Sequence, residues 1–133
     1  MFRGECRATS HYLRCIVNGS FERVFQELAA EFGDIYARRF GKVGESLSGV
    51  ILGEHYFFRV ENDAALLITL EEVTGAETRL EIIACAAGHG LLGFSYGAHN
   101  SYVHTVEDFL TNSGLTVRVE QETSYFGRSG SLG

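Results

Sequence analysis

The chain of 133 residues contains no proline, although average usage would supply about six or seven. This absence argues against a stiff linker and against a proline-rich recognition segment. Its cations are ten arginines and one lysine, Lys42, and Arg38-Arg39 is the only adjacent pair. Nucleic-acid binding needs clustered cations to neutralise phosphates, and the net charge here is −6. We therefore expect no nucleic acid as a partner.

Cysteine pairing and targeting signals are also missing. Cys6, Cys15 and Cys85 are an odd number and form no CxxC pair, so we expect reduced thiols. The start of the chain, Met1–Glu5, is not an apolar signal-peptide core, and no apolar run approaches the length of a membrane span. The expected location is the cytoplasm, with no membrane partner.

Length and hydropathy fit a globular domain with its own core. Hydrophobic residues make up 45% of the chain, and a chain of this length buries about two-thirds of its unfolded surface without disulfide or metal. We expect one α+β domain over residues 1–119. The polar, glycine-containing residues 120–133 are expected to be a flexible C-terminal tail.

Two helices are predicted. Ser20 can cap a helix over Phe21–Phe32, whose apolar residues recur at i, i+3, i+4 and i+7, and Gly33 is suited to end it. A second helix is expected to begin near His99–Ser101 and to end at Gly114.

The remaining segments are typical of strands joined by connections too short for parallel crossovers. The expected strands are Ala8–Val17, Asp34–Lys42, a segment from about Leu47 to Val60, Ala65–Leu70 and Arg79–Ala87, and Thr116–Val119 could add a short one. The order β-α-β-β-β-β-α predicts an antiparallel sheet with two helices on one face. It resembles the fold of one half of a TATA-binding protein and the related helix-grip folds, in topology only.

Two central strands are apolar on both faces. Leu66, Ile68 and Leu70 alternate with Ala65 and Leu67, and Arg79–Ala87 shows a similar pattern. A sheet covered by helices on one side should be polar on the other. We therefore expect a homodimer formed through the sheet face that the helices leave uncovered, or a ligand cavity there.

The segment Gly88–Tyr102 concentrates glycines, histidines and aromatic residues. The spacing Gly88-x-Gly90-x-x-Gly93 is that of a dinucleotide-binding loop, which also needs a helix opening on it within a βαβ unit. The expected helix starts too late, so we interpret the segment as a bend between strand and helix.

The candidate ligand-binding residues are His89, Tyr96, His99 and His104. His99 and His104 are five apart, about 140° around a helix, whereas His104 has Glu107 at i+3 and Asp108 at i+4. The expectation is no metal and no cofactor, with a small-molecule ligand left open. The catalytic residues are unknown.

Three stretches also resemble a known family. They are Glu54–Leu70, Gly88–Ala98 and Val106–Leu110. The sequence is similar to a family of short bacterial proteins, found mainly in Firmicutes, that is classed as a domain of unknown function. The resemblance implies no activity.

These observations favour a small cytoplasmic binding or interaction module that acts as a homodimer. The alternative is an enzyme or metal-dependent protein that uses the Gly/His segment 88–104.

Overall fold

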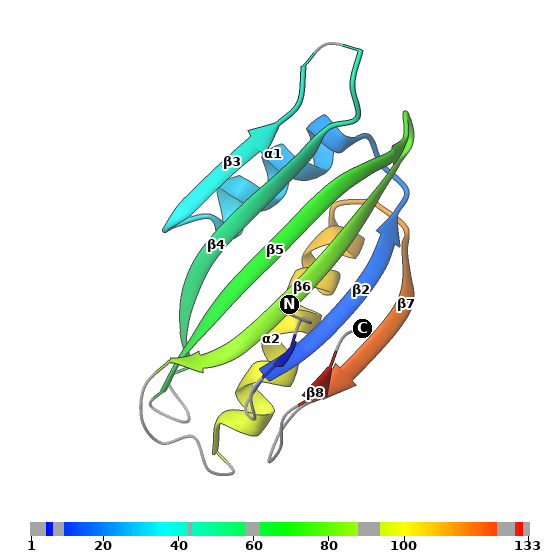
Figure 1. Ribbon diagram of the computed structural model, residues 1–133. Coiled ribbons are helices and arrows are strands. Elements are labelled where there is room, and N and C mark those ends of the chain that lie inside the picture. The colour runs from blue at the N-terminus through cyan, green and yellow to red at the C-terminus, as the bar shows by residue number, and fades with distance from the viewer. Residues whose placement is uncertain are drawn as a thin grey trace.

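The computed structural model describes residues 5–6, 10–42, 44–57, 62–87, 94–124 and 130–131. It is an α+β fold in two layers, a six-stranded antiparallel sheet with two helices on one face (Figure 1). The sheet has the order β3-β4-β5-β6-β2-β7. Its strands are β2 (Ser10–Val17), β3 (Tyr36–Phe40), β4 (Ser48–Phe57), β5 (Asn62–Thr74), β6 (Glu77–Ala87) and β7 (Val117–Ser124). A separate two-stranded sheet pairs β1 (Glu5–Cys6) with β8 (Gly130–Ser131).

Helix α1 (Phe21–Phe32) forms as its apolar spacing predicts. The Ser20 hydroxyl accepts a hydrogen bond from the Arg23 amide at 3.3 Å, and the Gly33 amide donates to the Ala29 carbonyl. The predicted bounds and both caps of this helix are confirmed. No helix in the described ranges is long and apolar enough to cross a membrane.

The core lies between the sheet and the helices. Alternate residues of β2, β5 and β6 point to this layer and meet the buried sides of α1 and α2 (Phe94–Asn112). Fully buried side chains include Leu13, Val24, Leu28, Leu66, Ile68, Leu80, Ile82, Val103, Val106 and Leu110. The predicted fold class, an antiparallel sheet covered by two helices on one face, is confirmed.

Several boundaries differ from the sequence prediction, as in β5, which spans Asn62–Thr74 where Ala65–Leu70 was expected, and two of the differences change an earlier inference. Helix α2 begins at Phe94, earlier than the expected His99–Ser101, so the late helix start is no longer an argument against a dinucleotide loop. The requirement for a parallel βαβ unit is still unmet, because every described strand pair of the main sheet is antiparallel. The predicted tail also begins too early, because Glu120–Ser124 belong to β7 and pair with β2.

The register of β7 shifts where it passes β2. Arg14 faces Gln121 and Cys15 faces Val119, so Glu120 is an extra residue in β7. Such a bulge places two consecutive residues on one strand opposite a single partner position. Beyond it, Glu122 lies opposite the core residue Leu13, on the helix side of the sheet.

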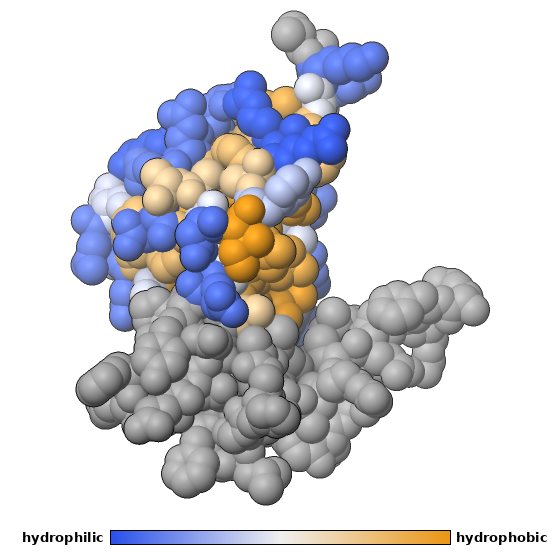
Figure 2. Space-filling model, turned by 90° about the vertical axis from the view of Figure 1, so that its left-hand side faces the viewer, coloured by the Kyte–Doolittle hydropathy of each residue, from blue (hydrophilic) through white to orange (hydrophobic). Residues whose placement is uncertain are grey.

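The uncovered face of the sheet is mixed rather than apolar throughout. Cross-strand pairing aligns one apolar row over five strands, made of Tyr36, Leu52, Leu67, Ile83 and Tyr12. The next rows contain charged and hydroxyl side chains, among them Thr69, Glu71, Arg79 and Glu81. Apolar surface bordered by hydrophilic side chains is also visible from the β3 side (Figure 2).

Glycine at two positions of β4 lets α1 approach the sheet closely. A Cβ on Gly49 would lie 2.9 Å from the Phe25 ring, and one on Gly53 would overlap the Phe32 carbonyl oxygen. The backbone at Gly53 therefore leaves no room for a side chain under the end of α1.

We predict that Gly53→Ala destabilises the fold by about 1–3 kcal/mol, because the new methyl group must displace backbone. The matched control is Gly75→Ala, where nothing lies within 4 Å of the added Cβ, and its effect should stay within about 0.5 kcal/mol. Urea unfolding of both variants measures the difference. Equal stability of the two would contradict the close packing of α1 on β4.

Candidate functional site

Three side chains that can ligate a metal meet between the sheet and α2. His11 Nε2 lies 2.7 Å from Glu122 Oε2, and His104 Nε2 lies 2.9 Å from the same oxygen. The two imidazole rings are 6.4 Å apart between centroids. One carboxylate oxygen thus sits between two ring nitrogens that come from β2 and α2.

The fold explains why these residues converge. His11 continues the helix-facing positions of β2, two residues before the core residue Leu13, and is itself buried. Glu122 faces Leu13 from the neighbouring strand. On α2, His104 follows the buried Val103 and is partly exposed, which places it at the rim of the core.

A second carboxylate contacts the other nitrogen of the His104 ring. Glu107 Oε1 lies 3.0 Å from His104 Nδ1, one helical turn further along α2. His104 therefore has a carboxylate at each ring nitrogen. This contact fixes the orientation of the ring and directs Nε2 toward Glu122.

The carboxylates favour the charged imidazole. Partial burial lowers the pKa of His104, but the hydrogen bonds with Glu107 and Glu122 outweigh it and raise the pKa above 6.5. Partial burial raises the pKa of Glu122, but its hydrogen bonds with His11 and His104 bring the pKa below 4.5. Near neutral pH the cluster therefore combines a carboxylate with an imidazole that tends to retain its proton.

Of the predicted ligand-binding residues, only His104 can be placed in this site. Tyr96 and His99 lie in α2, but their side chains are outside the described part of the structure, as is His89 altogether. The i+3 relation of His104 to Glu107 is readable from the sequence. His11 and Glu122, which are 111 residues apart, were not among the predicted site residues. The available signal for His11 was its place in a strand whose alternate residues are apolar.

The donor set fits a transition-metal ion. Two imidazole nitrogens and one carboxylate oxygen all lie within 4.8 Å of one another. Ligand atoms about 2.0–2.2 Å from Zn²⁺ in a tetrahedral site are about 3.3–3.6 Å apart. To bind an ion, Glu122 Oε2 would have to move away from the two ring nitrogens, which lie 2.7 and 2.9 Å from it, and the bridging protons would have to be lost. The expectation of no metal stays a prediction, and this geometry is the ground for the alternative proposed below.

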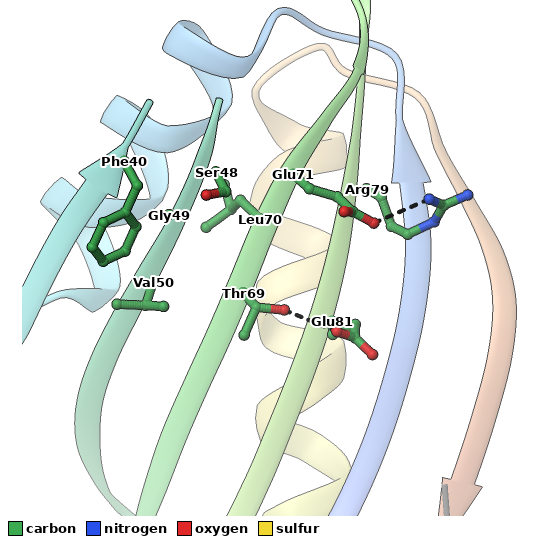
Figure 3. A pocket seen from close by; sticks show the side chains of 9 residues that line it. All are labelled: Phe40, Ser48, Gly49, Val50, Thr69, Leu70, Glu71, Arg79 and Glu81. Carbon is green, nitrogen blue, oxygen red and sulfur yellow. Dashed lines mark hydrogen bonds and ion pairs between the residues drawn. The ribbon is translucent and has the colours of Figure 1, made fainter. Parts of the chain in front are cut away.

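A hollow with a volume of about 310 Å³ lies on the uncovered face of the sheet (Figure 3). Its charged groups are already engaged, because Arg79 pairs with Glu71 at 3.1 Å and Thr69 donates to Glu81 at 3.1 Å. The Tyr12 hydroxyl donates to Glu81 at 2.6 Å, and burial together with this carboxylate raises the pKa of Tyr12 to about 12. The charged and hydroxyl groups of this hollow thus bond to one another, and we interpret the contacts as structural.

No protein-family model, curated protein or solved structure matches this chain. The resemblance to a bacterial domain of unknown function and the likeness to the TATA-binding-protein fold therefore stay predictions.

We predict that the His104–Glu122 contact stabilises the metal-free protein most between about pH 4.5 and 6.5. The contribution of His104, whose pKa is raised, is lost as pH rises through that pKa, and the contribution of Glu122 is lost as pH falls through its lowered pKa. The difference in unfolding free energy between the wild type and Glu122→Gln should shrink on both sides of this window. Urea unfolding across pH measures it.

The control is Glu120→Gln, since Glu120 pairs with Arg14 and Arg79 and no histidine. Its effect should not decline between pH 6.5 and 8. A pH-independent effect of Glu122→Gln, or an His104 pKa at 6.5 by NMR in the wild type, would refute the coupling.

Proposed function

We propose that the protein binds one divalent transition-metal ion through His11, His104 and Glu122, with Zn²⁺ as the best fit. The observation that carries the proposal is the convergence of three ligand atoms within 4.8 Å from three separate elements. The proposal keeps the predicted role of a binding protein, and it takes up the metal-dependent alternative with a ligand set that lies mostly outside residues 88–104.

The ligand types select among ions. Imidazole nitrogen suits Zn²⁺, Cu²⁺ and Ni²⁺, whereas Mg²⁺ and Ca²⁺ prefer all-oxygen sites. Two histidines with one glutamate are a common set for zinc, and three protein ligands leave the fourth tetrahedral position to water or another ligand. His104 and Glu122 are partly exposed, so an ion can reach the site from solvent.

Glu107 supports the same conclusion. Metal-bound histidines generally donate their other ring N–H to a carboxylate or carbonyl, which fixes the tautomer and raises ligand basicity. The 3.0 Å contact between His104 Nδ1 and Glu107 has this arrangement. Glu107 would remain a proton acceptor while Nε2 bound the ion.

We predict that the wild type binds one equivalent of Zn²⁺ in isothermal titration calorimetry and that Mg²⁺ does not compete. Glu107→Gln should weaken binding by about 10–100-fold, the usual effect of losing a partner of a ligand. His104→Ala and Glu122→Gln should weaken it more, because each removes a ligand. Saturation at 100 times the dissociation constant should raise the unfolding free energy by about 2.7 kcal/mol.

Glu120→Gln is the matched control, because it changes a glutamate on the same strand that points to the opposite face and pairs with arginine. Its Zn²⁺ affinity should equal that of the wild type. Equal binding by the wild type and by Glu122→Gln would reject this site.

A second candidate function is favoured by the apolar row on the uncovered face. Leu52, Leu67 and Ile83 lie side by side there, half-buried, in the centre of the sheet. We propose that two copies meet at this row to form a homodimer. Covering a row of aliphatic side chains removes apolar area from water, and the commonest way to do so is a two-fold pair.

We predict that light scattering at micromolar concentration gives twice the mass of one chain and that Leu67→Lys gives a single chain. Lys at this position has to be desolvated in the interface, whereas in the monomer it stays partly exposed. Lys42→Ala, in the loop after β3, is the control and should remain dimeric. A monomeric wild type would end this proposal.

The location in the cytoplasm is part of the same proposal. Cys15 is a free thiol in the core, and burial raises its pKa to about 12, so it is unreactive at neutral pH. An unpaired thiol of this kind fits a reducing compartment.

A further inference from the structure

The strand β3 forms one edge of the main sheet, and all five of its residues are exposed. An edge strand presents unpaired backbone N–H and C=O groups on its outer side, which can pair with a further strand. The other edge, β7, is interrupted by the bulge at Glu120. The pairing of β3 with β4 has no register shift over Tyr36–Phe40, so β3 is the more regular template.

Exposed apolar side chains gather at this edge. Five large hydrophobic residues are exposed among those described, and three of them, Ile35, Tyr36 and Phe40, lie in or next to β3. Figure 2 looks onto this side and shows apolar surface with hydrophilic side chains above and beside it. Apolar groups rimmed by polar ones are typical of a contact surface.

A cation lies at the centre of the strand. Arg38 is between Tyr36 and Phe40 on the uncovered face, and its guanidinium lies 4.9 Å from the centre of the Phe40 ring. Among the described residues no carboxylate pairs with Arg38, whereas the neighbouring Arg39 pairs with Glu22. The edge therefore offers an aromatic–cation–aromatic series in a protein of net charge −6.

This series argues against pairing between two copies of β3. Antiparallel pairing centred on Arg38 would place it directly opposite Arg38 of the second copy, and like charges directly opposite each other destabilise a sheet. The same series is complementary to a strand with a carboxylate at its centre and apolar residues two positions away on either side.

We propose that β3 accepts an extended segment of another protein, of the pattern apolar–x–acidic–x–apolar, as an added antiparallel strand. The acidic side chain lies opposite Arg38, and the apolar side chains lie opposite Tyr36 and Phe40. Backbone hydrogen bonds to the outer side of β3 provide affinity, and the alternate side chains provide specificity. This surface is separate from the metal site, which lies at the other edge of the sheet.

The test uses fluorescence anisotropy with two short labelled peptides that differ at one residue. One carries valine–threonine–glutamate–threonine–valine at its centre, and the other has lysine in place of the glutamate. The wild type should bind the glutamate peptide about fivefold more tightly. Arg38→Glu should reverse this preference, which also shows that the variant is folded. Arg118→Glu, on the β7 edge, should leave it unchanged.

Backbone pairing is tested with N-methylated forms of the glutamate peptide. Methylation of one alternate set of amides should abolish binding, while methylation of the other set should retain it, because only one set faces β3. Equal loss in both forms, no preference between the two charged peptides, or self-association that Arg38→Glu abolishes would each overturn the proposal.

Discussion

The insertion of β2 between β6 and β7 is the interaction on which the rest of the structure depends. It joins residues 10–17 to residues 78–85 on one side and to residues 117–124 on the other. Without it β7 would have no partner in the sheet, and α2 would lose part of the surface on which Val103 and Val106 pack. The same pairing brings His11 and Glu122 onto adjacent strands, so the polar site and the apolar core both depend on the position of β2.

Local signals predict the local parts of this fold well. The cap at Ser20, the apolar stripe of α1 and the end at Gly33 all concern residues within one helix, and all are confirmed. The expected strand Thr116–Val119 stops short of the end of β7 at Ser124, and the reason is physical. Glu120–Thr123 are too polar to signal a strand, and they become one because β2 provides backbone hydrogen bonds, which need no apolar side chain.

The candidate site also has a part that local sequence predicts and a part that it does not. His104 and Glu107 are one helical turn apart, and their relation is readable from spacing alone. His11 and Glu122 come from opposite ends of the chain, and no pattern in a single sequence relates residues at that separation. The apolar character of the uncovered face was also overestimated, since alternation in Ala65–Leu70 indicates Leu67 but not the Glu71, Arg79 and Glu81 that share the face with it.

The bulge at Glu120 has a consequence for how the site is encoded. Along a regular strand, side chains alternate, so Val117 and Glu122 would point to opposite sides of the sheet. The extra residue changes the parity of the count and turns Glu122 toward His11 and His104. A β7 of the same length that paired with β2 without the bulge would keep its ladder, yet its Glu122 carboxylate would face away from both imidazoles, whereas deletion of Glu120 would leave Glu122 opposite Leu13. The site therefore depends on where β7 departs from regular pairing as much as on the chemistry of its residues.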